Sequence, residues 1–313
     1  MSRALTAGGS HTLMTGSGNR QSLEGIPYDW PNRHASQVVQ AGGLSWHVQR
    51  MGAGRKLLLI HGTAASTHTW RGLMEILSRD YDVLAMDLPG HGYTSRRPDA
   101  AMTLNALSDS VCELLGSMGF RPDYIAGHSA GAAIALRMSI HGGASPDAIV
   151  GLNAALLPFG GALRAVFSPM AQLFATTQLM PRMVARRARD PSAVRRILNG
   201  TGSSIDDHGI ELYRGLLRRE GHVSAVLNMM ASWDLKPLLH DLPDLQARLF
   251  LLAGGRDKAV DPSEADKVAS RLPGVKVVRL QDCGHLAHEE APDRVAGLIV
   301  EACPPRTGGD GNG

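Results

Sequence analysis

Short apolar runs of the kind that form buried strands alternate along this chain with longer segments that have helical spacing. This alternation is typical of a mostly parallel sheet with helices on both faces. The segments expected to form helices are 103–118, 130–140 and 263–272. The runs expected to form strands are 44–49 (an early edge strand), 56–60, 82–86, 124–126, 148–152, 249–253 and 275–280. The sequence therefore predicts an α/β fold with a mostly parallel central sheet and flanking helices.

The alternation stops over residues 153–242, where the composition favours helices. This insert is rich in Met and Arg, and it holds the excess positive charge of the chain, whose formal net charge is +3. We expect it to form a helical cap, or lid, over the carboxyl edge of the sheet, where α/β proteins bind their ligands. The expected organisation is a flexible leader over 1–26, a core over 27–152 and 243–303, this cap, and a flexible tail over 304–313.

The sequence Gly127-His128-Ser129-Ala130-Gly131 lies directly between an expected strand and an expected helix. It matches the Gly-x-Ser-x-Gly turn that presents a nucleophilic serine. A serine on so sharp a turn has a strained backbone, so the residues two positions to either side must be small, as Gly127 and Gly131 are. The start of the following helix favours negative charge. Ser129 is therefore our candidate nucleophile.

Two residues farther along the chain complete a candidate catalytic triad. Asp257 follows the run at 249–253, and His285 follows the run at 275–280. The chain order Ser129, Asp257, His285 is that of triads built on the carboxyl ends of parallel strands. In such a triad the histidine takes the serine proton, and the acid orients and stabilises the imidazolium. Taken singly, Asp257 and His285 would be ordinary loop residues, but three such residues at three strand ends favour the triad.

The loop after the run at 56–60 begins His61-Gly62-Thr63. In triads of this chain order, one oxyanion donor comes from this loop and the other from the residue after the serine. We therefore expect the backbone N–H groups of Thr63 and Ala130 to form the oxyanion hole. For His61 we favour a role in holding the loop, and contact with the substrate is the alternative.

The apolar residues of the insert decide what reaches the serine, and they have two interpretations. The simpler one is that they pack the insert on the core. The other is a wide, adaptable apolar pocket, because methionine fills irregular gaps. In that case Phe159, Met229 and Trp233 are the expected substrate contacts, and the substrate is a large apolar molecule.

Charge and composition limit the other partners. A net charge of +3 is too small to make nucleic acid an expected partner. The arginines at 186–189, 195 and 196 are typical of a solvated helix face, and the alternatives are a contact with carboxylates, with an acidic partner, or with the surface of a membrane. No apolar run is long enough to predict a membrane-spanning helix.

No cofactor is expected from the motifs. There is no metal-ligand spacing of His, Cys, Asp and Glu, no phosphate-binding loop and no dinucleotide fingerprint. The three cysteines lie far apart, and the first residues show no targeting signal. We therefore expect a reducing compartment and a cytoplasmic location.

The serine turn, the His61-Gly62 loop, the turn at 87–92 (DLPGHG) and His285 together resemble the α/β-hydrolase superfamily over residues 27–303. A narrower resemblance, to the magnesium-chelatase accessory proteins of bacteriochlorophyll biosynthesis in phototrophic bacteria, rests on five segments. They are 29–33 (DWPNR), 127–137 (GHSAGAAIALR), 151–159 (GLNAALLPF), 233–239 (WDLKPLL) and 284–290 (GHLAHEE). This resemblance implies a role in photosynthesis near magnesium insertion into protoporphyrin, with a porphyrin and a chelatase subunit as expected partners, but it implies no known reaction.

Two hypotheses about function follow. The first is a serine hydrolase of the esterase type, which acts on an ester or related acyl bond of a large apolar substrate. The second is a non-catalytic accessory protein that binds a porphyrin or a magnesium-chelatase subunit. The intact triad favours the first, and the pathway association favours the second. A lyase on the same scaffold is a third alternative, because triads also serve as general bases.

Overall fold

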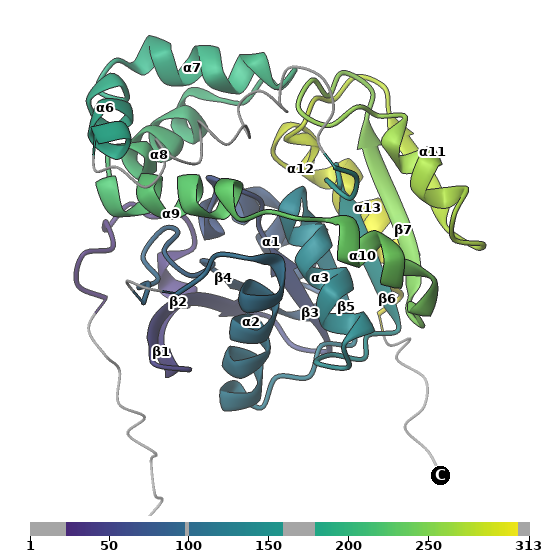
Figure 1. Cartoon of the computed structure of the whole chain (residues 1–313). Helices are drawn as coiled ribbons and strands as arrows, with labels where there is room; N and C mark the ends of the chain where they lie inside the picture. Colours follow the sequence, from purple (N-terminus) through teal and green to yellow (C-terminus); the bar gives the residue numbers. More distant parts are fainter. Residues whose placement is uncertain (1–22, 98–99, 159–178, 306–313) are drawn as a thin grey trace, which may run out of the picture.

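The computed structural model describes residues 23–97, 100–158 and 179–305. Most of the expected leader and tail lie outside these residues, and so does Phe159. The described chain forms an eight-stranded sheet in the order β1-β2-β4-β3-β5-β6-β7-β8, with helices on both faces (Figure 1). The pairs β1–β2 and β2–β4 are antiparallel, and the remaining pairs are parallel. The predicted fold class is therefore confirmed.

Each run that was expected to form a strand does so within a few residues. The first strand, however, was not expected, and the run at 44–49 lies inside the sheet rather than at its edge. The missed strand has only Val38 and Val39 between polar residues, so its apolar alternation is weak. It turns into the next strand through Gly42 and Gly43, whose φ angles of 56° and 72° suit a tight hairpin. The strands are β1 (Ser36–Ala41), β2 (Leu44–Met51), β3 (Arg55–Ile60), β4 (Tyr81–Met86), β5 (Tyr124–His128), β6 (Ala148–Leu152), β7 (Arg248–Gly254) and β8 (Lys276–Leu280).

Two apolar cores lie on the two faces of the sheet. Successive side chains of a strand point to opposite faces, so in β3 Leu58 and Ile60 belong to one core and Leu57 and Leu59 to the other. The first core is covered by α2 (Leu104–Met118), α3 (Ala130–Ile140), α10 (Lys236–Asp241) and α11 (Glu264–Ala269). The second is covered by α1 (Arg71–Leu77), α12 (Ala287–Glu290) and α13 (Pro292–Ala302). The described chain also contains the short 3₁₀ helices η1 (Arg33–Ala35), η2 (Thr67–Trp70) and η3 (Leu242–Asp244).

Among the described residues, four further helices lie between β6 and β7, and we call them the cap helices. They are α6 (Leu179–Arg187), α7 (Pro191–Gly200), α8 (Asp207–Leu217) and α9 (Glu220–Ala231). Figure 1 shows them gathered at one end of the molecule, with α6 and α7 farthest from the strands. Their buried Val194, Leu198 and Tyr213 pack with Ala65 and Leu286 of the sheet's loops, so the cap helices have an apolar base on the core. None of the described helices has both the length and the apolar character needed to cross a bilayer.

Candidate active site

The candidate nucleophile lies on the turn between β5 and α3. Ser129 has φ 53° and ψ −117°, so the strained backbone expected of this turn is observed. A Cβ added to Gly127 would lie 2.6 Å from Cα of Ala132, and one added to Gly131 would overlap the carbonyl oxygen of Ile60. Larger residues at either position would therefore push the turn away from the helix or from β3.

The candidate acid and base meet across the carboxyl ends of β7 and β8. Nδ1 of His285 lies 2.8 Å from Oδ2 of Asp257, and both residues are buried. Oδ1 of Asp257 accepts the N–H groups of Ala259 at 2.8 Å and Val260 at 2.9 Å. The carboxylate is thus held by its own loop and directs one oxygen at the imidazole, which places the second imidazole nitrogen, Nε2, away from the acid.

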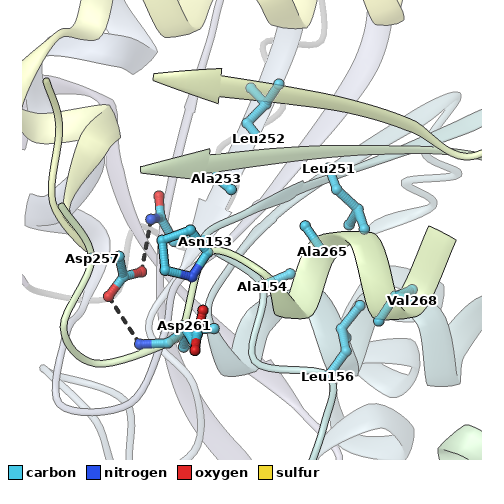
Figure 2. Close-up of a pocket in the computed structure, with 12 residues that line it drawn as sticks. Asn153, Ala154, Leu156, Leu251, Leu252, Ala253, Asp257, Asp261, Ala265 and Val268 are labelled. Atoms are coloured by element: carbon cyan, nitrogen blue, oxygen red, sulfur yellow. Dashed lines mark hydrogen bonds between the residues drawn. The ribbon is translucent and has the colours of Figure 1, made fainter. Parts of the chain in front are cut away.

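Asn153 is a further member of this site that the motifs do not mark. It follows β6 and has φ 47°. Its side-chain amide donates to Oδ2 of Asp257 at 2.8 Å and to the carbonyl oxygen of Gly284 at 3.2 Å. Figure 2 shows the two side chains facing each other, with Leu251 and Val268 among the apolar residues of the small cavity beside them. Because β6 lies between the strands that lead to Ser129 and Asp257, the sheet order would have predicted this contact.

The expected oxyanion loop lies directly against the serine turn. A Cβ on Gly62 would lie 2.9 Å from Cβ of Ser129, so glycine permits this close approach. The backbone N–H groups of Thr63 and Ala130 donate no hydrogen bond to another group in the described part of the chain. Both donors are therefore free to bind an oxygen of a ligand.

His61 lies beneath this loop and is fully buried. Its Nδ1 donates to the carbonyl oxygen of Gly62 at 2.7 Å, and its Nε2 accepts the N–H of Leu88 at 2.9 Å. Both ring nitrogens are occupied by the backbone, so the ring supports the loop and has no nitrogen left for a substrate.

The other expected substrate contacts come from the end of the cap helices. Met229 of α9 is buried, and its sulfur accepts the Thr63 hydroxyl at 3.9 Å, so it lies beside the oxyanion loop. Trp233 is half-buried, and its indole N–H has no partner among the described residues. Phe159 lies outside the described residues, so the structure does not place it.

The linker between α7 and α8 ties the cap helices to both the acid loop and the base loop. Gly202 has φ 83°, and a Cβ there would overlap the carbonyl oxygen of Arg256, next to the acid. Ser203 accepts the N–H of Leu286, next to the base, at 2.9 Å. The cap helices therefore support the acid and the base directly at this point.

Replacing Gly202 with alanine is expected to cost about 3 kcal/mol of unfolding free energy, because the methyl group adds a backbone collision to an unfavourable φ. Gly274→Ala is the matched control, since Gly274 has φ 86° but no atom near its Cβ position. We expect Gly274→Ala to lower the free energy of unfolding by about 1 kcal/mol. Urea unfolding of both variants measures the difference, and equal losses would show that the tight contact at Gly202 has no energetic effect.

A second tie between cap and core is a buried polar cluster around Glu289. Oε1 of Glu289 accepts the hydroxyls of Thr69 at 2.6 Å and of Tyr213, on α8, at 2.8 Å. Arg71 pairs with Oε2. Burial raises the pKa of Glu289, and the neighbouring guanidinium and hydroxyls oppose that rise. The cluster thus anchors α8 close to the base loop.

Eight histidines are buried in the described part of the chain. Burial lowers the pKa of six of them, to about 4 for His222 and about 3 for His288. The ring of His128 lies 4.7 Å from that of His285, so a neutral imidazole flanks the candidate base. No group of three metal-ligating side chains occurs among the residues that the structure describes. The six histidines with a lowered pKa are His61, His68, His91, His128, His222 and His288.

Comparison with known proteins identifies relatives over most of the chain. A family model described as the alpha/beta hydrolase family matches residues 57–298. The magnesium-chelatase 30 kDa subunit of Rhodobacter capsulatus is 35% identical over 278 residues, which cover 88% of this chain and 97% of that protein. The pimeloyl-(acyl-carrier protein) methyl ester esterase of Nitrosomonas europaea is 24% identical, over 80% of this chain and 96% of the esterase. A meta-cleavage product hydrolase from Pseudomonas fluorescens IP01 has a TM-score of 0.71 at 19% identity, over 86% of this chain and 98% of the hydrolase, which shows a shared fold.

Proposed function

This chain belongs to the alpha/beta hydrolase family, and from that premise we propose that it is a serine hydrolase of the esterase type. Two observations carry the proposal together: the 2.8 Å bond between His285 Nδ1 and Asp257 Oδ2, and the strained backbone of Ser129 at the start of α3. A protein that only bound a ligand would need neither feature. Ser129, Asp257 and His285 are the proposed catalytic residues.

In the proposed reaction, the Ser129 oxygen attacks the acyl carbon while His285 Nε2 takes its proton. Asp257 stabilises the imidazolium, and the N–H groups of Thr63 and Ala130 bind the oxyanion. The imidazolium then protonates the leaving alcohol, which departs and leaves an acyl-enzyme. A water molecule, deprotonated by His285, releases the acid and restores the serine.

The proposed substrate is an ester or related acyl compound of a large apolar molecule. Met229 lies beside the oxyanion loop, so an apolar side chain lies close to the proposed oxyanion donors, and Trp233 follows the end of α9. The relative from Rhodobacter capsulatus is named as a magnesium-chelatase subunit, which supports a role at the magnesium-chelatase step of bacteriochlorophyll biosynthesis. We therefore place porphyrin esters first among the substrates to be screened.

The second candidate function is a non-catalytic accessory protein that binds a porphyrin or a chelatase subunit. It is favoured by one observation, the 35% identity to a protein named as a subunit of a larger enzyme. Under this proposal the three residues of the triad would have no role in the cell.

Labelling with a fluorophosphonate distinguishes the two proposals. We expect intact-mass analysis to show a single adduct on the wild-type protein. The control variant Ser139→Ala, whose substitution lies in the last turn of α3, should show the same adduct. Ser129→Ala should show none, because the reagent reports an activated serine. Absence of the adduct on well-folded wild-type protein would contradict the hydrolase proposal and leave the binding proposal.

A further inference from the structure

The outer face of α6 and α7 carries a strong local charge. Residues 179–200 contain six arginines and a single carboxylate, Asp190. The whole chain has a formal net charge of +3, so the residues outside this segment together carry −2. The positive charge is thus concentrated on the two helices that Figure 1 shows farthest from the sheet.

Half of these arginines have no ion-pair partner in the described chain. Arg182, Arg195 and Arg196 pair with Glu220, Asp207 and Asp190 at 3.6, 2.7 and 3.7 Å. No carboxylate among the described residues forms an ion pair with the others, which are all exposed: Arg186, Arg187 and Arg189. Their charge is available to an anionic partner.

Large apolar side chains are exposed on the same two helices. Met183 is 64% exposed and Ile197 is 57% exposed, and Tyr28 is the other large apolar side chain with such exposure in the described chain. Met183 precedes Arg186 and Arg187 by three and four residues, so the three share one side of α6. The opposite side of α6 is occupied, since Ala185 is buried, and α7 is held to the cap by buried Val194 and Leu198. Both helices are thus fixed to the cap, while one large apolar side chain of each, Met183 or Ile197, stays exposed.

We propose that this face, formed by Arg186, Arg187, Arg189, Met183 and Ile197, docks on the surface of an anionic lipid bilayer. Arginines alone would fit an acidic protein equally well, but exposed Met183 and Ile197 fit a membrane interface, where such side chains enter the boundary between headgroups and acyl chains. Helices of nine and ten residues lie in that boundary and do not span it. The proposal is independent of the reactivity of Ser129.

Sedimentation with vesicles tests the proposal. We expect the full chain to bind vesicles of phosphatidylcholine mixed with phosphatidylglycerol and to bind pure phosphatidylcholine poorly. Reversing three charges, in Arg186→Glu with Arg187→Glu and Arg189→Glu, should lower the partition coefficient by at least about 100-fold, because each basic residue contributes about fivefold near such a surface and its reversal adds repulsion. Met183→Ser with Ile197→Ser should lower it by about tenfold, through lost apolar burial.

The matched control reverses three exposed charges on other surfaces: Arg121→Glu, Lys267→Glu and Arg271→Glu. It has the same net charge as the test variant, so an equal loss of binding would overturn the proposal. The proposal would also be overturned if binding did not depend on phosphatidylglycerol, or if reversing the charges of Arg186, Arg187 and Arg189 left binding unchanged. If the wild-type protein binds immobilised polyglutamate but no vesicle, the face fits an acidic protein and the membrane proposal is wrong.

Discussion

Asp257→Asn is expected to lower kcat for a chromogenic ester by about 10⁴-fold, since an amide in place of the acid of such a triad has an effect of this size. Oδ1 of Asp257 accepts two backbone N–H groups, so the amide oxygen of the variant should occupy that position. The NH₂ group then faces His285 Nδ1, which must become an acceptor. The ring proton moves to Nε2, and the base can no longer take the serine proton.

Asn153 supplies a stringent second test of this argument. In Asp257→Asn its amide would face another NH₂ group, whereas Asn153→Asp would place a carboxylate within reach of the same site. The double variant Asn153→Asp with Asp257→Asn should regain about tenfold in kcat, the size of coupling expected of neighbours in one hydrogen-bond network. No recovery would show that a carboxylate after β6 does not reach the base.

Asp261→Asn is the matched control for these variants. Asp261 is exposed on the same loop as Asp257. Its carboxylate accepts the backbone N–H of Ser263, whereas that of Asp257 is bonded to His285. We expect its kcat to equal that of the wild type. If Asp257→Asn behaved like this control, Asp257 would not be the acid of the triad.

The second large effect is a steep loss of stability in mild acid. Six buried histidines have a folded pKa below the ordinary value of 6.5, so unfolding takes up protons as the pH falls below 6.5. Every proton taken up removes about 1.4 kcal/mol per pH unit. For His222 this loss extends down to its folded pKa of about 4, and for His288 to about 3.

Two carboxyl groups oppose this trend in the same range. The pKa of Glu264 is raised to about 7 by burial, and that of Glu289 is also raised, so both bind protons more tightly in the folded chain. His222 and His288 together take up about two protons near pH 5.5, or about 2.7 kcal/mol per pH unit, and Glu264 offsets about half of this. The other four histidines add to the uptake, so the free energy of unfolding should fall as the pH drops below 6.5.

Urea unfolding between about pH 8 and about pH 5 measures this slope. His288→Asn removes one of the six groups, so its slope should be smaller by about 1.4 kcal/mol per pH unit. His34→Asn is the control, because His34 is exposed and its loss should leave the slope unchanged. The prediction would be contradicted if the free energy of unfolding did not change between pH 6.5 and about pH 5.

The sequence predicts those parts of this molecule that depend on short stretches of chain. The run at 56–60 is apolar because β3 is buried on both faces, and the turn at Ser129 needs small neighbours within two residues. Contacts between distant segments leave no such local pattern. Asn153 meets Asp257 across 104 residues, and Ser203 meets Leu286 across 83, so only the folded sheet and cap bring them together.

The position of the cap helices in the chain, between β6 and β7, has a consequence for how such proteins diverge. Since β6 and β7 are adjacent and parallel, the chain between them must return from one edge of the sheet to the other, and α10 packs on the core along that return. The strands therefore do not fix the length of the segment that holds α6 to α9. A different segment could be exchanged for it during evolution or by engineering. The linker limits that exchange, because any substitute must present a glycine to Arg256 and a hydroxyl to Leu286. Variation should therefore accumulate on the outward sides of α6 and α7 and be rare at Gly202 and Ser203.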